Sequence, residues 1–366
     1  MDFEFSGEQD QLRDTVRRFL SERAPTTYVR SMLDDPLGTT REVWQGLAAL
    51  GVTGLLVPER HGGAGRGMTD MGVVLEELGR AVHPGPFLSS AVGAASALVA
   101  VAGPDGDELL PRIADGSAVA TVALHDEGRR ATWRTPTTVA SNGALSGTKA
   151  FVPDAAGADV ILVTAATGDG IGLFAVEADA PGVVIIPSET PDGTRKVATV
   201  ELGAVAARRI GSGDATPALA GVVDRLLIAH VVDGVGAAST ALELAVEYTK
   251  ERKQFDRLIG SFQAVQHLCA EMLQALELGR AGAYYALWAA DAADPAELHR
   301  AATMAKAWAG DAFFKIGADA IQVFGGIGYT WEHDIHLAYK RLLSLQHVLG
   351  GTADHLEELA TIAIHP

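Results

Sequence analysis

The glycine-rich segment at 322–328 is the first place in this sequence whose residue types could bind a ligand. It reads QVFGGIG and follows a helical pattern rather than a strand, so the fingerprint of a Rossmann dinucleotide site does not apply. Its glycines could serve a loop that needs positive φ, or they could let a ligand phosphate or ring approach the backbone. The other glycine cluster, GGAG at 62–65, indicates only a turn.

The basic turn at 252–255, which reads RKQF, is the second such place, and Phe262 and Gln263 follow it closely. Arg252 and Lys253 are ordinary residues for the end of a helix, where the helix dipole favours cations. An arginine, an aromatic ring and a glutamine around one interhelical turn could also hold a planar heterocycle that carries a phosphate. The pattern alone leaves both interpretations open.

Signatures of several other catalytic classes are absent. The sequence has no GxSxG elbow and no P-loop, so neither a serine hydrolase nor a nucleotide triphosphatase is indicated. His333 and His336 could share a helix face, but no HExxH spacing and no second ligand pair accompany them, so we predict no metal site. The one cysteine, Cys269, excludes an internal disulfide and a cysteine-based metal cluster.

The composition is that of a folded protein with an acidic surface. The 366 residues are 48% hydrophobic and 20% charged, and they carry a formal net charge of −17. Such a charge repels nucleic-acid phosphates and anionic lipid headgroups, so we expect neither a nucleic acid nor a membrane as partner. The first residues lack the pattern of a secretion signal, and the most apolar stretch, 91–102, is too short to span a bilayer. We therefore expect a cytoplasmic protein.

The periodicity of apolar residues divides the chain into three blocks. Residues 1–117 show helical spacing, and residues 118–213 contain short β-branched runs separated by Gly, Pro and Asp. Residues 214–366 return to four long helical patterns, with a break at 350–351 in the last one. The expected fold is α+β, with an N-terminal helical domain, a middle antiparallel β-sandwich or barrel, and a C-terminal four-helix bundle.

Five short motifs occur in a fixed order along the chain. They read LLVPERHGG at 55–63, LEELGR at 75–80, LSGTK at 145–149, RKQF at 252–255 with Phe262 and Gln263, and QVFGGIGY at 322–329. In this order they resemble the acyl-CoA dehydrogenase family over nearly the whole chain. The resemblance implies the fold of that family, FAD as cofactor, an acyl-CoA thioester as substrate, and α,β-dehydrogenation. In that reaction a carboxylate removes the α-proton while a hydride passes from the β-carbon to N5 of the flavin.

The resemblance also implies residues that contact an FAD. Family members are usually dimers or tetramers of dimers, and the adenosine diphosphate half of each FAD is held by the neighbouring subunit. By motif match, the residues for that task here are Arg252, Phe255, Gln263, Gln322, Gly325 and Gly326, with Thr352 as a further cofactor contact. The residue types suit the task, because arginine pairs with pyrophosphate and paired glycines let backbone N–H groups approach it.

The catalytic glutamate of the family has no counterpart at either of its two known positions. One position directly precedes the Gly-Thr of the last helical region and holds Gly350 here, with Arg341 nine residues upstream as the register check. The other position, on the first helix of the bundle, holds Leu226. Neither residue can accept a proton. Asp233, two turns after Leu226 and on roughly the same face, is the candidate for a substitute base.

Two stretches that contact the flavin ring in the family are also altered. Residues 124–131 read LHDEGRRA where the family has a stretch like Thr-Glu-Pro-Gly-x-Gly-Ser-Asp, and residues 151–154 read FVPD where it has Trp-Ile-Thr-Ser/Asn. Groups that would hold a flavin within this chain are therefore missing, while the groups offered to a neighbour's flavin remain.

This asymmetry favours a hetero-oligomer, because a homo-oligomer needs both halves of the site on every chain. It resembles the bacterial acyl-CoA dehydrogenases for steroid side chains, heterotetramers in which only one of two unlike subunits carries the base. We therefore expect a second, glutamate-bearing subunit as partner. The alternatives are a homomeric enzyme that uses Asp233, a flavin-dependent oxygenase on the same fold, and a structural subunit without flavin contact.

Overall fold

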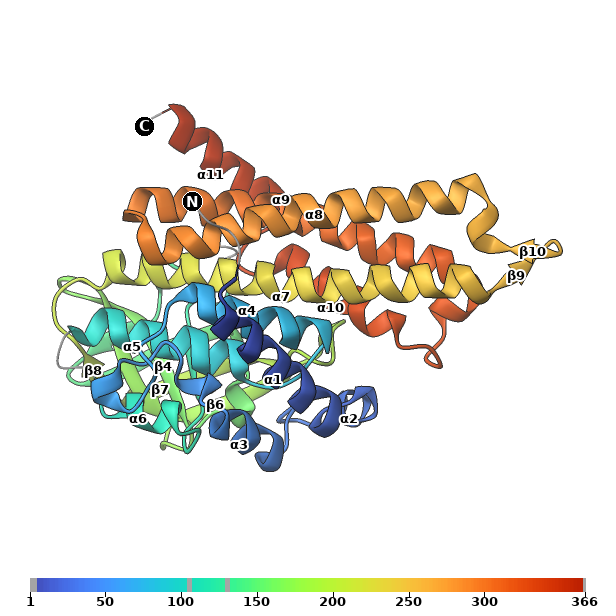
Figure 1. The fold of residues 1–366 in the computed structure, drawn as a ribbon. Coiled ribbons are helices and arrows are strands. Elements are labelled where there is room, and N and C mark those ends of the chain that lie inside the picture. The colour runs from blue at the N-terminus through green and yellow to red at the C-terminus, as the bar shows by residue number, and fades with distance from the viewer. Residues whose placement is uncertain (1–4, 104–106, 129–131, 365–366) are drawn as a thin grey trace. The chain divides into compact units, whose positions relative to one another are not determined.

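The structure is a computed structural model that describes residues 5–103, 107–128 and 132–364 (Figure 1). The chain forms two compact units, each assembled from separated stretches. Residues 1–27, 72–83 and 227–366 make up the first, which we call the bundle unit, and residues 28–71 and 84–226 make up the second, the sheet unit. The N-terminal helical block is thus divided between the two units.

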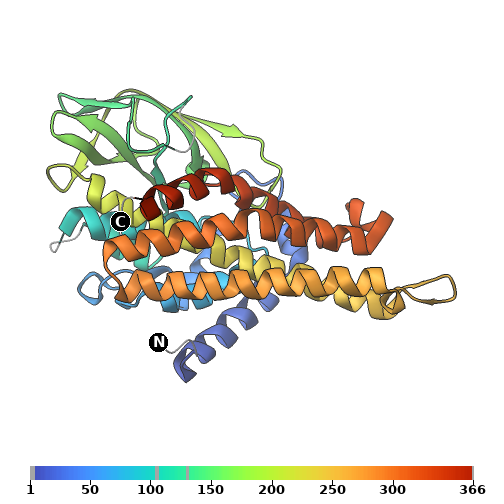
Figure 2. The ribbon, with the colours of Figure 1, turned by 90° about the horizontal axis from the view of Figure 1, so that it is seen from above.

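The bundle unit is built from long helices that lie side by side in both views (Figures 1 and 2). Its helices are α1 (Gly7–Arg23), most of α4 (Met68–Arg80), most of α7 (Thr216–Glu251), α8 (Gln263–Ala292), α9 (Pro295–Phe324), α10 (Ile335–His347) and α11 (Thr352–Ile364). The short connections include the hairpin of β9 (Lys253–Gln254) and β10 (Arg257–Leu258), and the 3-10 turns η6 (Ile259–Ser261) and η7 (Gly325–Tyr329). The last helical pattern is interrupted where the sequence predicts, between α10 and α11.

Local sequence signals explain where these helices begin. The Ser6 side chain accepts from the backbone N–H of Gln9 at 3.3 Å while the Gln9 side chain accepts from the Ser6 N–H at 2.9 Å, which is a complete capping box for α1. Asp294 caps α9 through the backbone N–H of Ala296 and Glu297, and Pro295 occupies the first helical position. These contacts satisfy N–H groups that have no partner within the helix.

Helices α4 and α7 approach each other at backbone distance because glycines lie at their crossing. A Cβ added to Gly79 would lie 2.0 Å from the carbonyl oxygen of Asp233, and one added to Gly236 would lie 2.1 Å from that of Glu76. No real Cβ tolerates such distances, so only glycine permits this packing.

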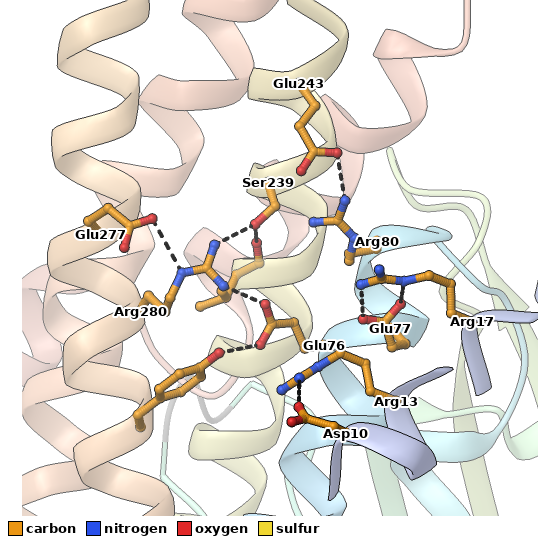
Figure 3. A network of polar contacts seen from close by, with 12 residues as sticks. Asp10, Arg13, Arg17, Glu76, Glu77, Arg80, Ser239, Glu243, Glu277 and Arg280 are labelled. Atoms are coloured by element: carbon orange, nitrogen blue, oxygen red, sulfur yellow. Dashed lines mark hydrogen bonds and ion pairs between the residues drawn. The ribbon is translucent and has the colours of Figure 1, made fainter. Parts of the chain in front are cut away.

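A polar network fixes α4 within the bundle unit (Figure 3). Two consecutive buried carboxylates, Glu76 and Glu77, point to different neighbours. Glu77 accepts two hydrogen bonds from Arg17 of α1, at 2.7 and 2.8 Å. Glu76 accepts from Arg280 of α8 at 2.5 Å and from the Tyr284 hydroxyl at 2.8 Å. Burial and the charge of Glu76 raise the pKa of Tyr284 to about 12, so this hydroxyl stays a donor at neutral pH.

Within its described residues, the sheet unit combines short helices with eight strands. Its helical segments are α3 (Arg41–Ala49), α5 (Ala95–Ala102), α6 (Leu109–Ala114), most of α2 (Thr26–Ser31), the π-helix η3 (Phe87–Ala94), and the 3-10 turns η1 (Val52–Gly54), η2 (Glu59–His61) and η5 (Ala155–Gly157). Its strands are β1 (Ala120–Ala123), β2 (Val139–Ser141), β3 (Ala144–Pro153), β4 (Val160–Thr167), β5 (Gly170–Glu177), β6 (Val183–Ser188), β7 (Val197–Ala206) and β8 (Arg208–Ile210).

The strand order is β6-β7-β3-β2-β4-β5-β8, with β1 beside β4. Most pairs are antiparallel, as predicted, but β1 and β2 each pair with β4 in parallel, so the sheet is mixed rather than purely antiparallel. The reason is connectivity. Strands β2 and β3 form a hairpin through the left-handed pair Asn142-Gly143, and the chain then returns to β4 in the direction of β2. The core of the sheet is apolar and includes the fully buried Leu145, Val163 and Val200.

A buried ion pair in the sheet unit joins Asp126, in a stretch that differs from the family pattern, to Lys149, in a motif that matches it. Lys149 is 0% exposed, and its Nζ lies 3.1 Å from Oδ2 of Asp126 and donates to Oγ1 of Thr164 at 3.0 Å. Burial lowers the pKa of Lys149 to about 8, against the opposing effect of the Asp126 charge. Asp126 also accepts from the backbone N–H of Thr138 at 3.1 Å. Residues 129–131 of the same stretch lie outside the described residues.

Substituting Asp126 by Ala is expected to lower the free energy of unfolding by about 3–5 kcal/mol, because the Lys149 ammonium is then buried without its counter-charge. Urea unfolding measures this change. The control is Asp169→Ala, which removes a carboxylate paired with Arg209 at the surface and should change stability little. Equal effects of the two substitutions would show that the buried pair has no special role.

Candidate functional site

The residues predicted to contact a neighbour's FAD gather at one end of the bundle unit. Arg252, Phe255 and Gln263 lie on the connection from α7 to α8, which carries the β9–β10 hairpin at the end of the bundle (Figure 1). Gln322, Gly325 and Gly326 lie where α9 ends. The rings of Tyr248 on α7 and Phe324 on α9 are in contact, with centroids 4.4 Å apart, so the ends of these two helices are neighbours.

The hairpin presents an aromatic side chain to solvent. Phe255 and the following residue, Asp256, have φ values of 55° and 63°, as a type I′ turn requires. Phe255 is 87% exposed. Behind it, the Arg257 guanidinium stacks on the Phe262 ring at 3.9 Å, which stiffens the base of the hairpin. A large aromatic side chain at such exposure is typical of a binding surface.

At this end of the bundle unit an arginine side chain and a stretch of glycine backbone are uncovered, although the N–H of Gly325 itself donates to the carbonyl oxygens at the end of α9. Arg252 is exposed and has no acidic partner within 4 Å among the described residues. Gly325 has a φ of 61°, and a Cβ added to it or to Gly326 would meet no atom within 4 Å. Gln263 begins α8, so it sits beside N–H groups that lack partners within the helix. A guanidinium, free backbone N–H groups and an exposed ring are the chemistry that a pyrophosphate joined to a heterocycle requires.

Thr352 is not part of this group. It begins α11 and lies against Gly310 of α9, where a Cβ on that glycine would be 2.8 Å from the Thr352 hydroxyl. Gly310 precedes Gly325 by 15 residues, or about 22 Å along a helix. The buried Oγ1 of Thr352 has no hydrogen-bond partner in the part of the chain that the structure describes, so a ligand hydrogen bond there would satisfy it.

The two positions of the family base lie in different surroundings, and neither carries an acid. Leu226 is buried in the sheet unit, with its Cδ2 3.3 Å from where a Cβ of Gly93 would lie. Gly350 lies in the turn between α10 and α11 of the bundle unit, with a φ of 107°. Position 226 is therefore packed with apolar atoms, and position 350 has a backbone conformation that favours glycine.

Asp233, the candidate substitute base, is engaged in a buried ion pair. Both of its carboxylate oxygens accept from Nη1 of Arg341, at 2.9 and 3.0 Å. Nη2 of Arg341 donates to the carbonyl oxygen of His83 at 3.1 Å, and the side chains of Asp233 and Arg341 are each only 3% exposed. Sequence reasoning missed this pairing. The available signal is that Asp233 interrupts the apolar run from Val231 to Val235.

The two histidines singled out in the sequence lie against aromatic rings. His333 lies against the Phe324 ring at 4.1 Å, and His336 contacts the Trp331 ring at 4.7 Å. Within 5–103, 107–128 and 132–364, no three His, Cys, Asp or Glu side chains are grouped as metal ligands. None of the described helices is both long and apolar enough to cross a membrane.

Comparison with known proteins decides the family. Residues 6–117 match the profile of the acyl-CoA dehydrogenase N-terminal domain, and residues 223–363 match that of the C-terminal domain. Acyl-CoA dehydrogenase IpdE2 of Mycolicibacterium smegmatis is 31% identical over 355 residues, which are 97% of this chain and 98% of that protein. The chain belongs to the acyl-CoA dehydrogenase family. The predicted family and fold are thereby confirmed.

Other relatives of this acyl-CoA dehydrogenase include longer proteins and complexes. Acyl-CoA dehydrogenase FadE34 of Mycobacterium tuberculosis is 34% identical over 98% of this chain, which spans about half (48%) of the length of that protein. A solved structure described as the Tcur3481-Tcur3483 steroid ACAD G363A variant has a TM-score of 0.90 and 33% identity, and the match covers 98% of both chains. The ChsE4-ChsE5 complex of Mycobacterium tuberculosis has a TM-score of 0.91 and 26% identity, with full coverage of both chains.

The family is FAD-dependent and oxidises acyl-CoA thioesters, so FAD is the cofactor of this acyl-CoA dehydrogenase. The residues fit the group, because Arg252 is an exposed cation, the backbone at Gly325 and Gly326 can be approached closely, and Thr352 has a buried hydroxyl without a partner among the described residues. In the stretch altered beside the flavin ring, Phe151 is 67% exposed with a φ of 53°, and Asp154 accepts from Ser89 at 2.6 Å. An aromatic ring is therefore retained there, while the hydroxyl of the family pattern is replaced by Pro153.

Proposed function

We propose that this chain is the subunit without a catalytic base in a hetero-oligomeric acyl-CoA dehydrogenase. Its bundle unit would complete the FAD site of a glutamate-bearing partner. The observation that carries the proposal is the contrast between two sets of residues. Arg252, Phe255 and Gly325 are open to a ligand, whereas the base positions hold Leu226 and Gly350.

The geometry of Asp233 supports this proposal over a homomeric enzyme with a displaced base. A general base must reach the proton that it removes, at hydrogen-bond distance or through one water. Both oxygens of Asp233 are bound to Arg341 in a buried pair. Moving this carboxylate to a substrate would leave the Arg341 guanidinium buried without its counter-charge, which costs several kcal/mol.

The relatives support a complex of unlike chains. Two of the similar structures carry two protein names each, Tcur3481-Tcur3483 and ChsE4-ChsE5, and the first is described as a steroid ACAD. By analogy with that relative, we extend the proposal to a steroid-derived acyl-CoA thioester as substrate.

The contribution of this chain to the reaction would be binding and orientation. FAD, when bound, supplies the acceptor for the hydride that leaves the β-carbon. Arg252 would pair with the pyrophosphate, the uncovered glycines would let the backbone at Gly326 approach it, and Phe255 would cover the heterocycle. The α-proton would go to the partner's glutamate, since this chain offers no carboxylate at either family position.

Co-expression with candidate glutamate-bearing subunits, followed by FAD and chain quantification, tests this function. We expect a stable complex in which the FAD content exceeds that of this chain purified alone, which should bind almost none. One FAD per chain in the protein purified alone would contradict the proposal. An acyl-CoA dehydrogenase activity of that protein would favour the homomeric enzyme, and oxygenation would favour an oxygenase.

A further inference from the structure

The turn between α10 and α11 has a conformation that disfavours any side chain at the base position. Leu349 and Gly350 have φ values of 56° and 107°, and the second is one that residues with a Cβ rarely adopt. A Cβ at Gly350 would lie 3.0 Å from Nε2 of His355, closer than about nine in ten real Cβ contacts. His355 is buried on α11, so its ring has little room to withdraw.

A buried lysine side chain contacts the backbone of this turn. Lys306 of α9 is 0% exposed, and its Nζ donates to the carbonyl oxygen of Gly350 at 2.9 Å and lies 3.5 Å from that of Gln346. No carboxylate lies within 4 Å of Nζ among the residues described, so the carbonyl groups at the end of α10 are its direct partners. A cation at this end of a helix is favoured by the helix dipole. On the other side of the turn, Oδ2 of Asp354 accepts from the Gly351 N–H at 2.8 Å.

We propose that Lys306 is a positioning residue that holds this turn in a backbone conformation unable to accommodate the side chain of a catalytic base. We call its contact with the Gly350 carbonyl the lock. The inference rests on the proposed function and deepens it. Position 350 lacks the glutamate of the family, and its backbone also has a conformation that disfavours any side chain there. Contacts from Lys306 of α9 and from α11 fix the turn at Gly350, so that a carboxylate cannot simply be returned there. The same lock fixes the start of α11, where Thr352 follows the turn directly.

The lock depends on the charge of Lys306. Burial lowers the pKa of Lys306 to about 8, with the charges of Asp311 on α9 and Asp354 on α11 opposing this shift. The neighbouring His355 stays neutral, because burial and the Lys306 charge lower its pKa. The groups that Lys306 contacts on α10 and in the turn are uncharged carbonyls, those of Gln346 and Gly350. Lys306 is therefore the group here that changes charge near pH 8, and its hold on the carbonyls weakens above that pH.

A double-mutant cycle between positions 306 and 350 tests the inference on the full chain. Gly350→Ala should lower the melting temperature by about 3–8 °C, and this loss should be clearly smaller when Lys306 is replaced by Met, because the turn can then relax. The matched control is Gly351→Ala, since a Cβ there has only ordinary contacts, 3.7 Å or more away. The inference would be overturned if the losses in melting temperature from the substitutions at 306 and 350 were additive. It would also be overturned if Gly350→Ala and Gly351→Ala lowered the melting temperature equally.

The pH dependence of the cycle separates positioning from simple packing. The loss caused by Gly350→Ala should be smaller at about pH 9.5 than at about pH 7 when Lys306 is present, and independent of pH with Met at that position. The variants are compared at equal pH, because the folded pKa of Lys306 lies below its ordinary value of 10.5. Its contribution therefore raises the stability of the unaltered chain from about pH 8 to about pH 10.5. A loss that is the same at both pH values would contradict the charge-dependent lock.

A further experiment measures activity. It uses a complex in which the catalytic glutamate of the partner subunit is replaced by glutamine. Adding Gly350→Glu to this chain should raise the rate of flavin reduction by an acyl-CoA less than tenfold over Gly350→Gln. A gain of about 10²–10⁴-fold, the range of a general base, would show that a carboxylate at position 350 reaches a substrate, and it would overturn both the inference and the proposed function. The cycle measures the thermal stability of this chain without FAD, so its failure is distinguishable from failure of the proposed function, which the FAD content of the complex reports. If Gly350→Ala does not fold, the same substitution with Lys306→Met decides, because rescue of folding supports the lock and its absence contradicts it.

Discussion

Asp233→Asn in this chain is expected to leave the dehydrogenation step of the assembled complex within about threefold of its unaltered rate, while lowering the stability of the chain by about 3–5 kcal/mol. The physical reason is that Asp233 neutralises Arg341 in the interior of the bundle unit. Single-turnover flavin reduction measures the step, and urea unfolding measures the stability. If Asp233 is the base, the step instead falls by about 10²–10⁴-fold.

A second variant separates stability from chemistry. Asp233→Leu combined with Arg341→Met removes both charges and should recover most of the stability lost in Asp233→Asn, because a buried ion pair can often be replaced by apolar groups of similar volume. The recovery is incomplete, since the hydrogen bond from Arg341 to the His83 carbonyl is also lost. A stable double variant whose complex has lost the chemical step would identify Asp233 as a participant in catalysis.

Arg252→Gln is expected to weaken FAD binding in the complex by about 10–100-fold, the value of a charge-assisted hydrogen bond converted to an affinity. Arg252 is exposed and without an acidic partner among the described residues, so the substitution should leave the fold intact. The dissociation constant of FAD, measured by flavin fluorescence, reports the change.

Lys253→Gln is the matched control for Arg252→Gln. It removes a neighbouring exposed positive charge from the same hairpin, on a residue outside the predicted cofactor set. We expect its effect on FAD binding to be small and to vanish at high salt, because it is only a general electrostatic effect. Equal losses for the two variants would show that this end of the bundle attracts FAD by charge alone.

Much of the fold follows from patterns that are local in the sequence. The order of the five motifs, from the LEELGR stretch to the QVFGGIGY stretch, identifies the family. The helical periodicity places α7, α8 and α9, and the glycine pair at 350–351 marks the end of α10. The mixed character of the sheet does not follow, because strand direction depends on the path of the chain between strands and not on residue pattern.

The candidate site likewise contains some residues whose positions follow from the sequence and some contacts that do not. Arg252 and Gly325 lie within motifs, so their positions at one end of the bundle unit follow from the helices that carry them. The pairing of Asp233 with Arg341 joins residues 108 positions apart, and no periodicity reports such a contact. The burial of Lys306 is equally hidden, because a lysine within an alanine-rich helix is usually at the surface.

The most direct measurement of the central claim is flavin reduction by an acyl-CoA in this chain alone, with FAD added in excess, compared with the same chain in complex with a glutamate-bearing partner. The account predicts no reduction above background for the chain alone and rapid reduction for the complex. Reduction in the isolated chain at a rate near that of the complex would contradict it, because this polypeptide would then contain its own base.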